Sequence, residues 1–178
     1  MGHNVQIIAA STVHNSDTNL IADNTLYKKI NEDGVNYILI NSRNYTGNGI
    51  NRIINMLDFA YKLPQVCRHF EKPDVIISTS MTMFACAEGI RIGRRWGVKT
   101  VAQITDLWPE TLIAYRIVSK WNPIVLGLRY LEKWIYSRAD RIIFSMEGAY
   151  DYIIEQKWDR DIVSDKVFFI NNGVELES

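Results

Sequence analysis

The strongest candidates for chemistry lie in the segment 105–110, which reads Thr-Asp-Leu-Trp-Pro-Glu. An apolar run typical of a buried strand precedes this segment, and a helical pattern follows it. In an open parallel sheet, ligands bind at the carboxyl ends of the strands. Asp106 at such a junction can orient a substrate hydroxyl or accept its proton. Thr105 can form hydrogen bonds there, but it cannot act as a base near neutral pH.

Structural roles compete with chemistry in the same segment. Pro109 suits the first position of a helix, where a missing N–H costs nothing. Glu110 then lies in the first turn, where the helix dipole favours a negative charge. Both acids of the segment are therefore either site residues or helix caps, and Trp108 is either a platform for a ligand or a core side chain.

A second candidate segment, 78–82, joins another apolar run to a helical pattern. Its hydroxyl groups can form a rim that binds a sugar acceptor, or a phosphate at the helix N-terminus. The alternative is that Ser80 or Thr82 only caps the helix. Because both segments follow strands, we predict that Asp106 lies within about 15 Å of Ser80, roughly three strand spacings. The candidate rim consists of Ser78, Thr79, Ser80 and Thr82.

Two arginines, Arg43 and Arg52, flank a glycine-containing loop at 44–49. Arginine suits bidentate contact with phosphate, so this loop is a candidate clasp for a pyrophosphate. An ordinary solvated loop before a helix is the alternative.

The candidate segments belong to a regular alternation of strand-like and helix-like patterns. The strand-like runs are mostly continuous and apolar, which is typical of strands buried on both faces of a parallel sheet. The alternation predicts an α/β fold, a doubly wound Rossmann-like parallel sheet with helices on both faces, as one domain over residues 1–178. The predicted strands are 5–10, 35–40, 74–79, 99–105, 140–145 and 167–171, and the predicted helices are 50–70, 83–96, 110–118, 123–138 and 147–157.

Composition and charge exclude several classes of function. The 178 residues include 20 basic and 20 acidic side chains, so no net positive charge attracts nucleic acid. The two cysteines, Cys67 and Cys86, have neither metal-ligand nor disulfide spacing, and we expect buried free thiols in a reducing compartment. The scattered histidines have no ligand spacing either. We therefore predict no metal site and no cofactor.

The predicted helix at 123–138 is rich in aromatic and basic residues. At helical spacing, its apolar stripe consists of Ile124, Leu128, Leu131 and Ile135. Arg129, Lys133 and Trp134 then lie off this stripe, an arrangement that suits an anionic membrane surface. An ordinary amphipathic helix with its charges in water is the alternative.

Four short motifs occur in order along the chain, and together they resemble the amino-terminal domain of glycosyltransferase family 4, whose members are retaining sugar transferases with the GT-B fold. Asp-Leu-Trp-Pro resembles in particular the bacterial fucosamine- and aminosugar-transferase-like proteins of surface polysaccharide synthesis. The family often has His before this Asp, where the present chain has Thr105, so the role of that histidine does not carry over. The motifs are Gly-His-Asn-Val at 2–5, Lys-Pro-Asp-Val-Ile at 72–76, Asp-Leu-Trp-Pro at 106–109 and Asn-Gly-Val-Glu at 172–175.

The resemblance implies transfer of a sugar from a nucleotide-sugar donor, of the UDP-hexosamine type, to a polysaccharide or polyprenyl-linked acceptor. It implies a cytoplasmic reaction at the inner face of the plasma membrane, without a metal. The chain would be the acceptor-side half of such an enzyme, with Asp106 as its catalytic residue. The acceptor-binding residues would be the hydroxyl rim, Thr105, Trp108, Glu110, Arg43 and Arg52.

The resemblance also implies two parts outside residues 1–178, a first strand–helix unit and a carboxy-terminal domain that holds the donor. We therefore expect the chain to transfer no sugar by itself. In the family, the first strand lies between the strands that match 5–10 and 74–79. Without it these two strands would pair directly, leave a gap or recruit a strand from another molecule, and we expect self-association because free strand edges invite pairing.

Two other classes of function remain open. A non-catalytic α/β ligand-binding module, or the remnant of an enzyme, would keep the sheet and lose the acceptor rim. A domain similar to nucleotide-sugar 2-epimerases has the same fold class, but it needs acid–base residues that this sequence does not display.

Overall fold

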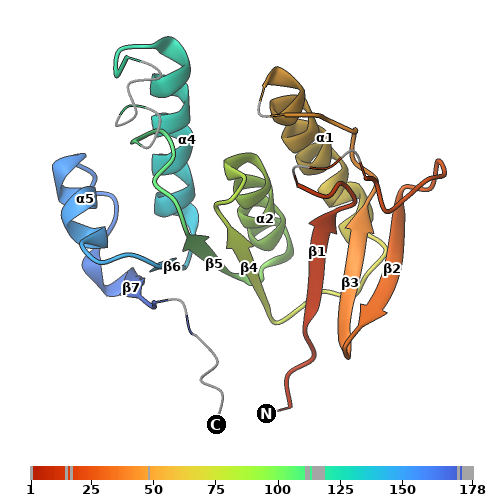
Figure 1. The fold of residues 1–178 in the computed structure, drawn as a ribbon. Coiled ribbons are helices and arrows are strands. Elements are labelled where there is room, and N and C mark those ends of the chain that lie inside the picture. The colour runs from red at the N-terminus through yellow and green to blue at the C-terminus, as the bar shows by residue number, and fades with distance from the viewer. Residues whose placement is uncertain are drawn as a thin grey trace, which may run out of the picture. The chain divides into compact units, whose positions relative to one another are not determined.

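The computed structural model describes residues 2–14, 16, 18–47, 49–110, 113, 119–171 and 173 (Figure 1). The chain divides into two compact units, Met1–Glu71 and Lys72–Ser178, each with its own sheet. The predicted helix at 110–118 and the motif at 172–175 lie mostly outside the described residues. In the described part of the chain, no helix is long and apolar enough to cross a membrane.

Unit 1 contains β1 (Gln6–Ala10), β2 (Tyr27–Glu32), β3 (Val35–Ile40) and α1 (Ile50–Cys67). Its sheet has the order β1-β3-β2, with β1 parallel and β2 antiparallel to β3. β2 is absent from the predicted strands because its sequence is mostly polar. The hairpin turns at Asp33 and Gly34, which have φ angles of 51° and 80°. Helix α1 packs on β3 and buries Phe59, Leu63 and Val66.

Unit 2 confirms the predicted α/β fold, with a parallel sheet flanked by helices. The strand order is β4-β5-β6-β7 (Figure 1). Because all neighbouring strands are parallel, the four carboxyl ends lie along one edge of the sheet. The elements are β4 (Val75–Thr79), α2 (Met83–Trp96), β5 (Lys99–Ile104), α4 (Pro123–Arg138), β6 (Arg141–Phe144), α5 (Ala149–Glu155), a short 3₁₀ helix (Ser164–Lys166) and β7 (Val167–Phe169).

Local sequence signals set the boundaries of α2 and α4. The Thr82 hydroxyl accepts a hydrogen bond of 3.3 Å from the backbone N of Ala85 and caps α2. Gly97 ends that helix in the left-handed conformation, at a φ of 69°. Asn122 caps α4 in the same way, and Pro123 occupies its first turn. Both helices have the predicted bounds.

Two glycines of α2 allow the helix to approach the sheet closely. A Cβ atom at Gly89 would lie 2.0 Å from the Oγ of Ser78, and one at Gly93 would lie 2.1 Å from the Cγ2 of Thr100. Any larger residue at these positions would push α2 away from β4 and β5.

The core of unit 2 lies between the sheet and its helices. The Tyr136 ring of α4 packs edge-on against Phe144 of β6 and against Trp158, with centroid distances of 5.5 and 6.1 Å. Both cysteines are free and buried, as predicted, Cys67 in unit 1 and Cys86 in this core. Burial raises the pKa of the Cys86 thiol to about 12.

Each sheet ends in a strand with a free edge. Among the described strands, β1 pairs only with β3 and β4 pairs only with β5. On β4, Val75 and Ile77 are exposed apolar side chains. The two strands thus belong to different sheets, one in each unit.

Candidate functional site

The carboxyl edge of the unit 2 sheet brings together the two segments predicted to share a site. The backbone N of Ser80 donates to the Gln103 carbonyl at 2.8 Å. The Ser80 hydroxyl accepts from the backbone N of Thr105 at 3.1 Å. Asp106 is the next residue, and neighbouring Cα atoms are about 3.8 Å apart. The predicted proximity of Asp106 and Ser80 is confirmed.

Asp106 is exposed at this edge, on a loop that the core holds from behind. Leu107 and Trp108 are half-buried and pack against the core. The backbone N of Trp108 donates to the Asp106 carbonyl at 3.1 Å, which folds the loop back on itself. The loop thus presents the exposed carboxylate of Asp106 to solvent at the place where α/β sheets bind ligands.

The Thr105 hydroxyl is an unusual feature of the edge. Its Oγ1 is buried and has no hydrogen-bond partner among the described residues. A buried hydroxyl without a partner costs free energy, about 1–3 kcal/mol. The Thr105 backbone is bonded to Ser80, so this buried hydroxyl lies beneath the exposed Asp106 loop.

Glu110 closes the segment with an ion pair. Its Oε1 accepts from the Nε of Arg129 on α4 at 3.0 Å and from a terminal nitrogen of the same guanidinium. The two side chains are only 28% and 25% exposed. The side chain of Glu110 thus ties the segment after β5 to α4.

The rim residues divide into two groups. Ser78 lies against Gly89, so its hydroxyl fills the contact between β4 and α2. Thr82 takes the capping role that was its alternative. Thr79 is exposed, and Ser80 is bonded to Thr105 as described. Ser80 is only 4% exposed, so at the edge itself the exposed rim is reduced to Thr79.

Sequence reasoning missed Glu132, which is 2% exposed in the middle of α4. Its carboxylate accepts hydrogen bonds from the hydroxyls of Tyr136, at 2.8 Å, and Tyr152, at 2.9 Å. Burial raises the pKa of Glu132 to about 7, with a further upward contribution from the charge of Glu110, while the two tyrosines and Arg129 oppose the rise. The group therefore changes charge near neutral pH.

The predicted apolar stripe of α4 is partly wrong. Ile124 is 71% exposed, and Val125 is buried in its place. The buried face runs through Leu128 and Glu132 to Ile135. This spacing of four and three residues was a usable signal that Glu132 faces inward.

The expectation that three side chains of α4 face a membrane is corrected by their contacts. Arg129 pairs with Glu110, and Lys133 pairs with Asp161 at 2.6 Å. Trp134 packs against the core. All three side chains therefore make contacts within unit 2. Helix periodicity alone could not predict these contacts, because the partners Glu110 and Asp161 lie on other segments.

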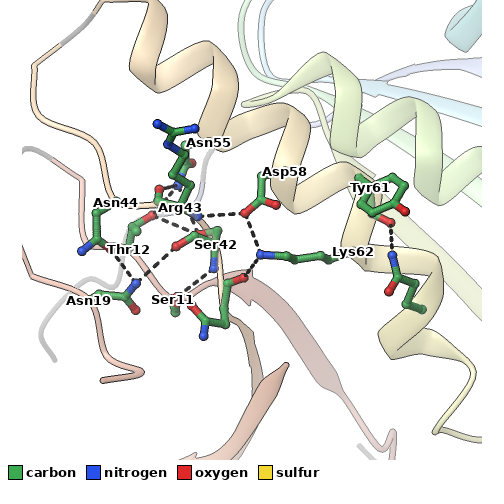
Figure 2. Close-up of polar contacts among 12 residues, drawn as sticks. Ser11, Thr12, Asn19, Ser42, Arg43, Asn44, Asn55, Asp58, Tyr61 and Lys62 are labelled. Atoms are coloured by element: carbon green, nitrogen blue, oxygen red, sulfur yellow. Dashed lines mark hydrogen bonds and ion pairs between the residues drawn. The ribbon is translucent and has the colours of Figure 1, made fainter. Parts of the chain in front are cut away.

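In unit 1, a polar cluster surrounds the carboxyl ends of the parallel strands β1 and β3 (Figure 2). The side-chain amide of Asn55 donates to the hydroxyls of Thr12, at 3.1 Å, and Ser42, at 3.2 Å, and to the Arg43 carbonyl. Ser11, Ser42 and Asn55 are buried. The serines that follow two apolar runs were the sequence signal for this cluster.

The predicted arginines belong to this unit. The backbone N of Arg43 donates to Asp58 at 2.8 Å, and Asp58 in turn pairs with Lys62 at 2.8 Å (Figure 2). The Arg43 side chain is exposed, whereas Arg52, in the first turn of α1, is half-buried. The Asp58–Lys62 pair thus fixes the backbone from which the Arg43 side chain extends.

Within the described residues, no group of His, Cys, Asp or Glu side chains is arranged to hold a metal ion. The unit 2 edge offers an exposed carboxylate on Asp106 and an exposed hydroxyl on Thr79, two groups that can bind the hydroxyls of a sugar. No curated protein matches the chain. The family model for Glycosyltransferase Family 4 matches all of residues 1–178. The chain therefore belongs to glycosyltransferase family 4.

Proposed function

We propose that the chain forms the acceptor-binding side of a retaining bacterial hexosyltransferase, similar to the fucosamine- and aminosugar-transferases of surface polysaccharide synthesis. The donor would be a UDP-hexosamine, held mainly by residues outside this chain, and the acceptor a polysaccharide or polyprenyl-linked sugar at the cytoplasmic face of the membrane. The observation that carries the proposal is the exposed Asp106, held next to Ser80 by the hydrogen bond from the Thr105 backbone, in a chain of this family.

In this proposal Asp106 orients the acceptor hydroxyl or accepts its proton, a role that typically contributes about 10²–10⁴-fold to a rate. The exposed Thr79 hydroxyl binds a neighbouring hydroxyl of the acceptor, Ser80 positions the backbone of Thr105, and the Trp108 ring supports the loop. Glu110 acts indirectly, through its ion pair with α4. In unit 1, Arg43 and Arg52 are candidates to bind the diphosphate of a lipid carrier.

An NMR titration of the chain with N-acetylglucosamine, and separately with UDP, tests the acceptor site. We expect the sugar to shift the backbone amides of 79–82 and 105–108, and UDP to leave them unchanged. Asp106→Ala should weaken sugar binding about ten- to a hundredfold, because loss of a hydrogen bond to a charged group costs about 1.5–3 kcal/mol. Asp159→Ala, at another exposed aspartate, is the matched control.

Shifts that avoid both segments, or equal affinities for Asp106→Ala and the unaltered chain, would contradict the acceptor site. Turnover of a UDP-sugar by purified 1–178, abolished by Asp106→Ala, would contradict the division of labour, because the donor site would then lie inside this chain.

A membrane contact of α4 remains part of the proposal, on a different surface from the one predicted. Trp121, Ile124 and Tyr130 are 74%, 71% and 75% exposed, and the Lys120 ammonium lies 5.4 Å from the centre of the Trp121 ring. Aromatic and basic side chains together favour an anionic interface.

Flotation with phosphatidylglycerol vesicles measures this contact. We expect the chain to float at low ionic strength and to be released at about 0.5 M salt, since screening weakens the attraction. Trp121→Ala should reduce binding, and Lys133→Gln, whose ammonium is occupied by Asp161, should not. Failure to float at any salt concentration would rule the contact out.

The free edge of β4 is the surface that we propose for self-association. Its unpaired backbone and the exposed Val75 and Ile77 present the groups that an added strand would cover. Sedimentation velocity of Ile77→Lys against the unaltered chain measures this association, because a charge on a free edge discourages pairing.

A further inference from the structure

A chain of charged and hydroxyl side chains connects the Asp106 segment to the interior of unit 2. It begins with Glu110, which pairs with Arg129. Arg129 and Glu132 are three residues apart on α4, so they lie on neighbouring positions of the helix surface. Glu132 ends the chain at Tyr136, on the same helix, and Tyr152, on α5. Helices α4 and α5 thus meet at one buried carboxylate, and the segment after β5 is attached one helical turn away, at Arg129.

Arg129 is hydrogen-bonded to Glu110, whereas the carboxylate of Glu132 is hydrogen-bonded to the two tyrosines. The charges of Glu110 and Arg129 both act on Glu132, in opposite directions, and the repulsion from Glu110 is the larger of the two. When Glu132 is neutral, Arg129 pairs with Glu110 alone. When Glu132 is ionised, it attracts Arg129 and repels Glu110, which weakens the attachment of the segment to α4.

We propose that Glu132 is a positioning residue for the Asp106 site, because its charge determines how firmly Arg129 holds Glu110 and therefore how firmly the segment 105–110 is fixed. The inference rests on the proposed function only in assigning the site to Asp106. The titratable groups of the described residues that act most on Glu132 are Glu110 from the segment after β5, Arg129 and Tyr136 from α4, and Tyr152 from α5, while Cys86 of α2 acts on Tyr136.

A purely structural role explains this carboxylate poorly. Burying an ionisable side chain costs free energy, and an apolar side chain of similar volume often packs at no such cost. The tyrosine hydroxyls satisfy the carboxylate, but they do not require a group that changes charge at neutral pH. Through the ion pair between Arg129 and Glu110, a change in the charge of Glu132 would act on the segment that carries Asp106.

Backbone amide exchange of the segment 105–110, corrected for the intrinsic effect of pH, tests the proposal on the chain itself. We expect exchange to become faster from pH 6 to pH 8, on the order of tenfold for a change of one nearby charge. Glu132→Gln should keep slow exchange at both pH values, because it retains an oxygen for the tyrosines and cannot ionise. Arg129→Gln should exchange fast at both.

Lys133→Gln is the matched control, since it breaks the other ion pair of α4 and should respond to pH as the unaltered chain does. The same pH response in Glu132→Gln as in the unaltered chain would overturn the proposal. Slow, pH-dependent exchange in Arg129→Gln would also overturn the proposal. This second variant tests the proposal even if Glu132→Gln does not fold. Failure of N-acetylglucosamine to bind would contradict the proposed function, and the exchange result would still decide this inference.

Discussion

Replacing Glu132 by alanine should destabilise the chain by about 3 kcal/mol at pH 5. At that pH the side chain is neutral, so its removal relieves no buried charge. It does leave two buried tyrosine hydroxyls without their acceptor, each at a cost of about 1–3 kcal/mol, and it opens a cavity that water can only partly fill. For a chain of this length, the loss corresponds to a fall in Tm of about 6–12 °C.

Thermal or urea unfolding, followed by far-UV circular dichroism, measures the difference. Glu155→Ala is the matched control, because that glutamate is exposed on α5 and its removal should change stability by no more than about 0.5 kcal/mol. Tyr152→Phe removes one of the two hydroxyls and should cost about 1 kcal/mol. If Glu132→Ala is as stable as Glu155→Ala, the hydrogen bonds to Glu132 contribute nothing to folding.

The second large effect is a dependence of stability on pH. The pKa of Glu132 is about 7 in the folded chain against an ordinary value of 4.5. Between these values the folded chain holds a proton that the unfolded chain has lost, so stability must fall as pH rises. The difference between these two pKa values corresponds to a stability contribution of about 3 kcal/mol, fully present below pH 4.5 and lost above pH 7.

The difference in unfolding free energy between Glu132→Gln and the unaltered chain isolates this effect. Other groups, including Asp140 with its lowered pKa, contribute equally to both proteins and cancel. We expect the variant to gain about 3 kcal/mol on the unaltered chain as pH rises from 4.5 to 8. Parallel stability curves for the two proteins would mean that Glu132 is ionised at all these pH values.

Continuous apolar runs were enough to predict most of the sheet. β1, β3, β4, β5, β6 and β7 fall within the predicted runs. The expected burial on both faces is wrong for β4 and β7, because Val75 and Ile77 of β4 and Phe168 and Phe169 of β7 are exposed. β2 has no continuous apolar run, since it lies at the edge of a mixed sheet and its side chains are mostly polar. The Asp33–Gly34 pair was the available signal, because this dipeptide favours a two-residue hairpin turn.

The candidate site was predictable only as far as chain order allowed. The carboxyl ends of β4 and β5 had to be close once the strands were parallel, so Ser80 and Asp106 could be placed together. The partners of Arg129 and Glu132 could not, because they lie on a loop and a helix that only the folded core brings to α4. The periodicity of one helix considered alone predicts that charged residues such as Arg129 and Glu132 face solvent.

The burial of both cysteines makes the chain convenient for site-specific labelling. With a pKa of about 12, the Cys86 thiol is ionised in on the order of one molecule in 10⁵ at pH 7, and the thiolate is the form that reacts with maleimides. Cys67 is also shielded from reagents, at 7% exposure. A single cysteine introduced at the exposed Thr79 could therefore carry a fluorophore or spin label with little labelling of the two native cysteines. Such a label would report on the neighbouring segment 105–110.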